Sequence, residues 1–173
     1  LRDGRLGDFL WEKIMHAGKP FGLRPGHTSS IRRIEAAMLS YHADMDISTN
    51  PFELGLGRLV DLDMEYHFIG KAALRAIQAK GVSRVLVGLK IDGLPLENPN
   101  TKHWPLKKNG EQIGHITSAI YSPRLKKNIA LGMVEIAYRS QGTNLIVQSE
   151  WNERRATVVE IPFHDPARMI ART

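Results

Sequence analysis

The chain has 173 residues, of which 42% are hydrophobic and 24% charged, so it can bury a core as one domain or as two small ones. This composition excludes a disordered tail, and no apolar stretch approaches the roughly 20 residues that span a bilayer. There is no cysteine, which excludes a disulfide framework, a thiolate nucleophile and a cysteine-based zinc site. The formal net charge of +6 favours anionic partners.

The start of the chain carries no secretory signal pattern. It begins at Leu1 without a methionine and enters an amphipathic segment at once. Together with the lack of cysteine, this favours a cytoplasmic location, and we expect the chain to be part of a larger protein.

Helical spacing dominates the part of the chain before residue 82. Apolar residues recur there at intervals of three and four, which predicts helices over 6–18, 31–41 and 70–81. Gly18 and Gly81 end the first and third of these. The Thr/Ser cluster just before the second helix offers N-caps.

The period changes to two after residue 82. Val85, Val87, Leu89 and Ile91 alternate with a second set of side chains, as in a β-strand. Asn-Gly at 109–110 is typical of a hairpin turn, and it lies within the segment 106–121. Further strands are expected over 129–138, 144–149 and 155–161. Five or six short strands at this spacing predict a small antiparallel barrel or a sandwich.

Two loops carry weak ligand patterns. Residues 55–60 contain Gly-x-Gly, but Val60 replaces the third glycine of a dinucleotide loop, so we expect tight packing there instead. Residues 44–50 space oxygen atoms like a calcium loop, but Thr49 and Gly55 replace its glycine and its glutamate, so we interpret them as a helix-exit loop. The histidines do not fall at metal-ligand spacing, and no Ser/His/Asp set can be proposed. We therefore expect no metal site.

Charged residues on the second predicted helix have two interpretations. Arg32, Arg33 and Glu35 could pair with opposite charges across the helix or could line a cleft.

The connection between two later strands is basic. Arg124, Lys126 and Lys127 come from one tight turn, and Lys107 with Lys108 precedes the neighbouring hairpin. The turn is interpreted either as a solvated rim or as an anion site. The strands have few aromatic residues to stack bases, so we expect no nucleic-acid partner.

Several stretches resemble, in the same order, the C-terminal half of the glycine-cleavage T-protein family, the tetrahydrofolate-dependent aminomethyl- and methyltransferases. They are "RRIEAAMLSYHADMDISTNPFELGLG", "HFIGKAAL", "LVGLKIDG", "GEQIGHITSAIYSPRLKKNIALGMVEI" and "VVEIPFHDP". Together they cover nearly the whole chain. The details "WPLKKNGEQIGHITSA" and "SPRLKKNIALGMVE" look closer to the dimethylsulfoniopropionate demethylase branch.

The resemblance implies an α+β fold in two parts. Residues 1–82 would be the C-terminal part of a folate-binding body, and residues 83–173 a small antiparallel β-barrel with its tail. The cofactor would be tetrahydrofolate, and the partners would be the N-terminal half of the same enzyme and a small-molecule one-carbon donor. Whether a lipoyl carrier protein docks stays open. No membrane partner is expected.

The family's catalytic acidic residue belongs to the N-terminal half, so the resemblance assigns no catalytic residue here. It implies that this chain alone is inactive. A non-catalytic, folate-binding-like scaffold is the alternative outside enzymes.

One position departs from the T-protein pattern. The family's Ala-Arg-Asp, whose arginine lines the folate site, aligns with Thr28-Ser29-Ser30, so Ser29 stands in place of the arginine. Serine lacks the planar, permanently charged fork of arginine, which favours the demethylase-like branch over strict aminomethyl transfer. Arg33 and Glu35 match the family's Arg-x-Glu, with a structural or a folate-facing role.

Basic residues near the barrel are candidates for the folate tail. That tail carries carboxylates, which arginine and lysine bind well. The candidates are Arg124, Lys126, Arg168 and Arg172.

Overall fold

The computed structural model describes residues 3–26 and 29–167 of the chain. Its helices are α1 (Gly7–Gly18), α2 (Ser30–Glu35) and α3 (Lys71–Lys80), with short 3₁₀ turns η1 (Gly4–Leu6), η2 (Lys19–Phe21), η3 (Gly57–Leu59) and η4 (Ile136–Tyr138). Its strands are β1 (Arg84–Ile91), β2 (Trp104–Lys108), β3 (Glu111–Ser122), β4 (Lys127–Glu135), β5 (Asn144–Gln148) and β6 (Glu153–Val159).

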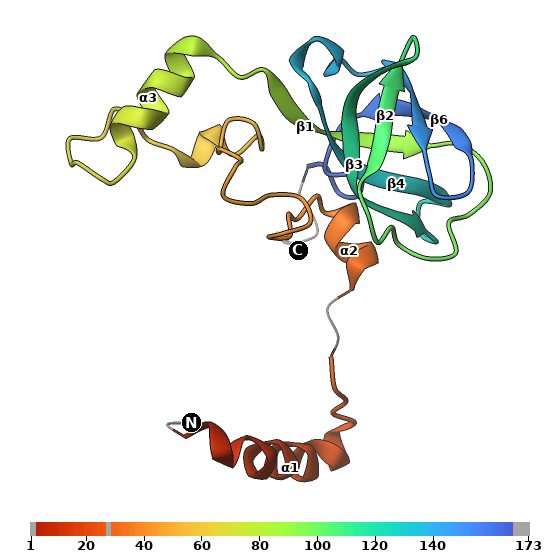
Figure 1. Cartoon of the computed structure of the whole chain (residues 1–173). Coiled ribbons are helices and arrows are strands. Elements are labelled where there is room, and N and C mark those ends of the chain that lie inside the picture. Colours follow the sequence, from red (N-terminus) through yellow and green to blue (C-terminus); the bar gives the residue numbers. More distant parts are fainter. Residues whose placement is uncertain (1–2, 27–28, 168–173) are drawn as a thin grey trace.

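The six strands form one closed antiparallel barrel in the order β1-β4-β3-β2-β5-β6, and β6 pairs back onto β1 (Figure 1). Closure leaves no free sheet edge, and it decides between the two predicted architectures in favour of the barrel. The fold is therefore α+β, with a helical part preceding a small antiparallel barrel, as the sequence predicts.

Alternation along β1 separates two apolar clusters. Val87, Leu89 and Ile91 belong to the larger core cluster, whereas Leu86 packs in a second cluster with Ile34 of α2. Successive strand residues point to opposite faces, so one strand serves both clusters. The second cluster thus fastens α2 to the barrel.

The predicted hairpin at Asn109-Gly110 is confirmed. Both residues have positive φ, 52° and 85°, as a two-residue turn between β2 and β3 requires. Ser29 is confirmed as the N-cap of α2, because its Oγ accepts a hydrogen bond from Arg32 N at 3.3 Å.

The second helix is shorter than its apolar spacing predicts. It ends at Glu35, and Ala37 adopts a left-handed φ of 52°. A helix cannot continue through that conformation, so the prediction of helix over 36–41 is wrong. The chain instead turns back, which brings the following loop against α2.

Helix α1 has no buried side chain and makes its main contacts with the 3₁₀ turns that flank it (Figure 1). Its apolar residues are exposed, among them Phe9 at 60% and Trp11 at 53%. An amphipathic helix in a folded protein normally covers its apolar face. The described residues leave this face uncovered.

Candidate functional site

A buried ion pair joins α2 to the loop that follows it. Arg33 Nη1 donates to Asp44 Oδ2 at 2.5 Å, and the Asp44 side chain is 0% exposed. Arg33 Nη1 also donates to the Met38 carbonyl at 3.0 Å, and Ser40 N donates to Asp44 Oδ2 at 2.9 Å. The guanidinium of Arg33 and the N–H of Ser40 compensate the Asp44 carboxylate, so its charge is tolerated in the interior.

The same carboxylate is fixed to the barrel through β3. Thr117 Oγ1 and Ser118 Oγ donate to Asp44 Oδ1 at 2.6 and 2.7 Å, and Ser118 Oγ accepts from Arg33 Nη2 at 2.8 Å. Neighbouring strand residues normally point to opposite faces. Here the pairing of β3 with β4 shifts between Ile116 and Ser118, and this bulge lets both hydroxyls reach one carboxylate.

Glu35 makes the second link between α2 and the barrel. Ser122 Oγ donates to its Oε1 at 2.5 Å, and His164 N donates to its carbonyl at 3.0 Å. Arg124 Nη1 lies 4.0 Å from Glu35 Oε2, while the Arg124 side chain remains 53% exposed. The Arg-x-Glu pair of α2 therefore makes structural contacts with β3 and the turn after it.

The predicted site residues fall into three groups. Ser29, Arg33, Glu35 and Arg124 lie along α2 and the turn that faces it. Lys126 is exposed in the same turn and has a positive φ of 52°. Arg168 and Arg172 lie outside the described residues. The structure thus brings together four of the predicted residues without showing folate contact by any of them.

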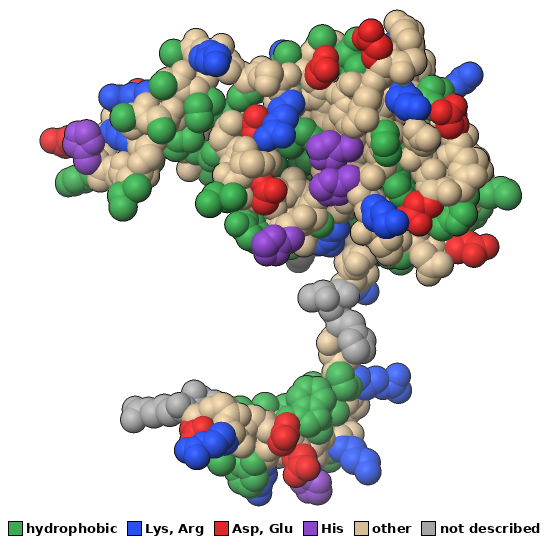
Figure 2. Space-filling view, in the orientation of Figure 1, with side chains coloured by type: hydrophobic (Ala, Val, Ile, Leu, Met, Phe, Trp, Pro, Cys, Tyr) green, Lys and Arg blue, Asp and Glu red, His purple; other side chains and the backbone are tan. Residues whose placement is uncertain are grey.

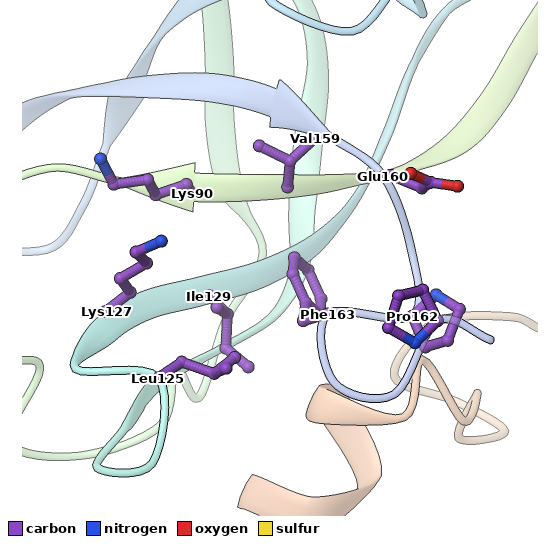
Figure 3. Close-up of a pocket in the computed structure, with 9 residues that line it drawn as sticks. Lys90, Leu125, Lys127, Ile129, Val159, Glu160, Pro162 and Phe163 are labelled. Carbon is purple, nitrogen blue, oxygen red and sulfur yellow. The ribbon is translucent and has the colours of Figure 1, made fainter. Parts of the chain in front are cut away.

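A pocket of about 290 Å³, here called the basic-turn pocket, lies beside that turn (Figure 3). Lys90 and Lys127 lie at one end of it, Glu160 and Pro162 lie at the other, and Phe163 lies between them. Its full lining is Lys90, Leu125, Lys127, Ile129, Val159, Glu160, Pro162, Phe163 and Pro166. Apolar walls with ammonium groups at one end suit a ligand that has an apolar body and an anionic end.

A second pocket of about 220 Å³, here called the histidine pocket, lies between the 42–49 loop and the barrel. The rings of His103 and His115 stack with centroids 4.7 Å apart and planes at 18°. Two adjoining histidines are visible on this face in Figure 2. Its full lining is His42, Ala43, Asp44, Met45, Asp46, Ser48, Thr49, Arg84, His103, His115, Thr117 and Met133.

Burial lowers the pKa of His115, and the positive charges of His103 and Arg84 lower it further. His103 is held in place by a 3.1 Å hydrogen bond between its Nε2 and the Ala43 carbonyl. The hydrogen bond from Ser48 lowers the pKa of Asp46 on the same loop. His115 and Asp46 both lie close enough to Arg84 for its charge to contribute to lowering their pKa values.

Sequence reasoning missed the residues that organise this region. The sequence predicts Asp44 in a helix-exit loop and Thr117 and Ser118 within a hairpin strand, and it shows His103 and His115 only as histidines without metal-ligand spacing. Asp44 meets Thr117 and Ser118, and His103 meets Ala43, through contacts between segments 60 or more residues apart, whereas His115 stacks on His103 across the pairing of β2 with β3. The Thr117-Ser118 pair within an otherwise apolar strand is the only local signal.

Neither pocket offers a metal site, since the described residues contain no group of three or more His, Asp or Glu able to hold an ion. No helix of residues 3–26 and 29–167 has the length and apolar character needed to cross a membrane. Both pockets have basic side chains among their lining residues, Lys90 and Lys127 in the first and Arg84 in the second.

Two family models match this chain. Residues 84–165 match the glycine cleavage T-protein C-terminal barrel domain, and residues 3–64 match the GCVT N-terminal domain. The chain therefore belongs to the glycine cleavage T-protein family.

The relatives and one solved structure agree with this assignment. Aminomethyltransferases of Synechococcus sp. strains CC9902 and WH7803 are 41% and 43% identical over 91% and 94% of the chain, covering 42% of each relative. A dimethylsulfoniopropionate demethylase of Ruegeria pomeroyi is 37% identical over 90% of the chain and 42% of the relative.

The crystal structure of the glycine cleavage system aminomethyltransferase T from Bartonella henselae is similar with a TM-score of 0.69. It is 27% identical, and the match covers 78% of this chain and 37% of that one. The chain thus spans less than half the length of its relatives.

Proposed function

We propose that the full-length protein is a tetrahydrofolate-dependent one-carbon transferase of the methyl-transferring, demethylase type. Residues 1–82 would close the folate-binding body and residues 83–173 would be the barrel and its tail, in a cytoplasmic enzyme. The observation that carries the proposal is the match of both parts of this chain to one transferase family.

The buried contacts suit a supporting role for this chain. Arg33 and Glu35 fix α2 to β3, so the body segment and the barrel hold a defined mutual position. A transferase that orients two substrates depends on such rigidity, because orientation supplies much of its rate. The described residues contain no candidate for the proton transfer, which we assign to the N-terminal half.

Ser29 favours methyl transfer over aminomethyl transfer. Its hydroxyl caps α2, so this position serves the helix and offers no guanidinium to a ligand. The similarity to the demethylase is consistent with this choice. In the proposed reaction a sulfonium methyl group moves to a nitrogen of tetrahydrofolate, the sulfonium becomes a thioether, and the nitrogen loses its proton.

The residues of the basic turn fit the carboxylate tail of folate. Lys126 is exposed and makes no ion pair with the described residues, and Arg124 keeps half its surface free beside Glu35. The apolar wall of the basic-turn pocket could receive the ring that precedes the tail. When bound, tetrahydrofolate would supply the nitrogen that accepts the one-carbon unit.

The tail assignment is tested by charge reversal in the full-length protein. Arg124, Lys126, Arg168 and Arg172 are replaced together by glutamate, and folate affinity is measured by calorimetry. We expect affinity to fall at least tenfold, and unchanged affinity would remove these residues from the folate site.

Aminomethyl transfer is the second candidate, because the aminomethyltransferases reach 41% and 43% identity. The two are separated by giving the full-length protein tetrahydrofolate with either dimethylsulfoniopropionate or an aminomethyl-loaded lipoyl carrier protein. Methyltetrahydrofolate from the first donor alone supports the proposal, and methylenetetrahydrofolate from the second alone rejects it. Folate binding without turnover of either donor would favour the scaffold.

A further inference from the structure

The histidine pocket contains donors that the proposed transfer does not use. Arg84 Nε donates to Glu53 Oε1 at 2.9 Å, and Arg84 Nη2 donates to the Ser48 carbonyl at 3.0 Å. Nη1 is therefore left without a hydrogen bond to the described residues. The His115 ring stacks on His103 and makes no hydrogen bond to the described residues either. Both groups line the same hollow.

His42 adds a third donor at the edge of the pocket. The centroids of the His42 and Tyr41 rings lie 4.4 Å apart in an edge-on arrangement, and His42 makes no side-chain hydrogen bond within residues 3–26 and 29–167. It is exposed, so its side chain is free to turn toward a ligand.

The acidic groups around the pocket already have partners. Asp44 is held by Arg33 and two hydroxyls, and Asp46 accepts from Ser48 Oγ at 2.6 Å. Glu53 accepts from the guanidinium of Arg84. Asp46 Oδ2 is exposed and receives no hydrogen bond from the described residues; the other facing groups with unused capacity are the nitrogen donors of Arg84, His42 and His115. These donors call for a ligand with acceptor oxygens.

We propose that the histidine pocket binds the carboxylate of a small molecule, with Arg84 Nη1 and His115 as the donors and His42 closing the rim. A carboxylate suits these donors because it has two oxygens, so that one can accept from Arg84 Nη1 and the other from the His115 ring. At about 220 Å³ the hollow accommodates a carboxylate with a short stem, while the remainder of the ligand extends into solvent. The inference does not depend on the proposed transferase activity.

The pocket should bind more tightly at lower pH. Burial and the positive neighbours lower the pKa of His115, so the ring is uncharged at neutral pH. A bound carboxylate would reverse that penalty and raise the pKa of His115 by linkage, while the carboxylate itself stays ionised above about pH 4.3. We expect affinity about tenfold higher at pH 5.5 than at pH 7.5, which is one pKa unit of coupling.

The test uses the full-length protein labelled at histidine and followed by NMR from pH 5 to pH 8. Succinate and p-aminobenzoyl-L-glutamate are the carboxylate probes, and inorganic phosphate is the comparison anion. Saturable binding of either carboxylate with an upward shift of the His115 pKa is expected. Binding of succinate indicates a free acid as the source, whereas binding of the glutamate probe alone indicates the folate tail.

Three variants make the test specific. His115→Gln removes the central donor and should weaken carboxylate binding about tenfold. His42→Asn keeps the left-handed backbone at φ 72° and should weaken binding about threefold, so it remains informative if His115→Gln unfolds. His67→Gln changes an exposed histidine outside the pocket and should bind like the wild type. Binding by phosphate alone, or wild-type affinity in both pocket variants, would overturn the proposal.

Discussion

Asp44 is the residue on which the junction between the helical part and the barrel depends. It receives hydrogen bonds from Arg33, Ser40, Thr117 and Ser118, and none of its side chain is exposed. Removing one member of a buried pair leaves the other charge uncompensated, which is more damaging than losing a surface contact.

Asp44→Asn is therefore expected to lower the free energy of unfolding by about 3 kcal/mol, because the Arg33 charge loses its counter-ion. Urea denaturation followed by circular dichroism measures the change. The matched control is Asp46→Asn on the same loop, which should leave stability nearly unchanged because this position is exposed. Equal effects of the two variants would contradict the structural role of Asp44.

His115 gives stability a pH dependence at the same scale. Its pKa is lowered in the folded state, so above about pH 6.5 the ring is neutral both folded and unfolded. As pH falls below that value the unfolded chain binds the proton first, and stability declines until the pH passes the folded-state pKa. His115→Gln should remove this part of the acid-side decline.

The measurement is the midpoint of thermal unfolding between pH 5 and pH 7.5 for the wild type and His115→Gln. The exposed His67→Gln variant should retain the wild-type slope. A slope in His115→Gln as steep as that of the wild type would show that burial of this ring is not the cause.

Elements whose identity rests on local pattern were predictable. Helices α1 and α3, the alternation of β1 and the Asn109-Gly110 turn follow from periodicity and turn chemistry within short windows. The bulge at Thr117 and the early end of α2 were not predictable. Each is stabilised by a contact with a distant segment, and a single sequence does not show which segments meet.

The candidate site was also predictable only in part. Arg33 and Glu35 were selected by resemblance and Arg124 from the charge of the basic turn, and the three lie together. The hydroxyls and the carboxylate that hold Arg33 and Glu35 come from β3 and from a loop. Stacking of His103 on His115 arises only when β2 pairs with β3. Spacing along the sequence cannot reveal such pairs.

Gly88 of β1 marks a close approach between the barrel and the segment after β6. A Cβ at this position would lie 2.2 Å from Ile161 Cγ2 and 3.1 Å from the ring of Phe163. Gly88→Val should therefore destabilise the barrel by about 1–3 kcal/mol through overpacking. Gly26→Ala is the control, since no atom of the described residues lies within 4 Å of its added Cβ. Chemical denaturation measures both, and a Gly88→Val barrel as stable as the control would contradict this packing.

At the scale of the whole molecule, α1 requires a covering surface. Its exposed apolar side chains, Phe9 and Trp11 among them, contrast with the closed core of the barrel. The relatives are more than twice as long as this chain, so we expect the preceding part of the protein to cover α1.

Hydrogen exchange tests that expectation. Amides of α1 should exchange at least tenfold more slowly in the full-length protein than in the 173-residue chain, while those of β3 and β4 should change little. Equal exchange of α1 in both proteins would show that the preceding part does not cover it.

The central claim is that this chain is the supporting end of a folate-dependent transferase whose reacting groups lie in the preceding part of the protein. It is tested most directly by assaying the full-length protein and the isolated chain in parallel for tetrahydrofolate-dependent methyl transfer from dimethylsulfoniopropionate. The account predicts methyltetrahydrofolate from the full-length protein and none from the chain. Turnover by the chain alone, or no folate product from the intact protein with either one-carbon donor, would contradict it.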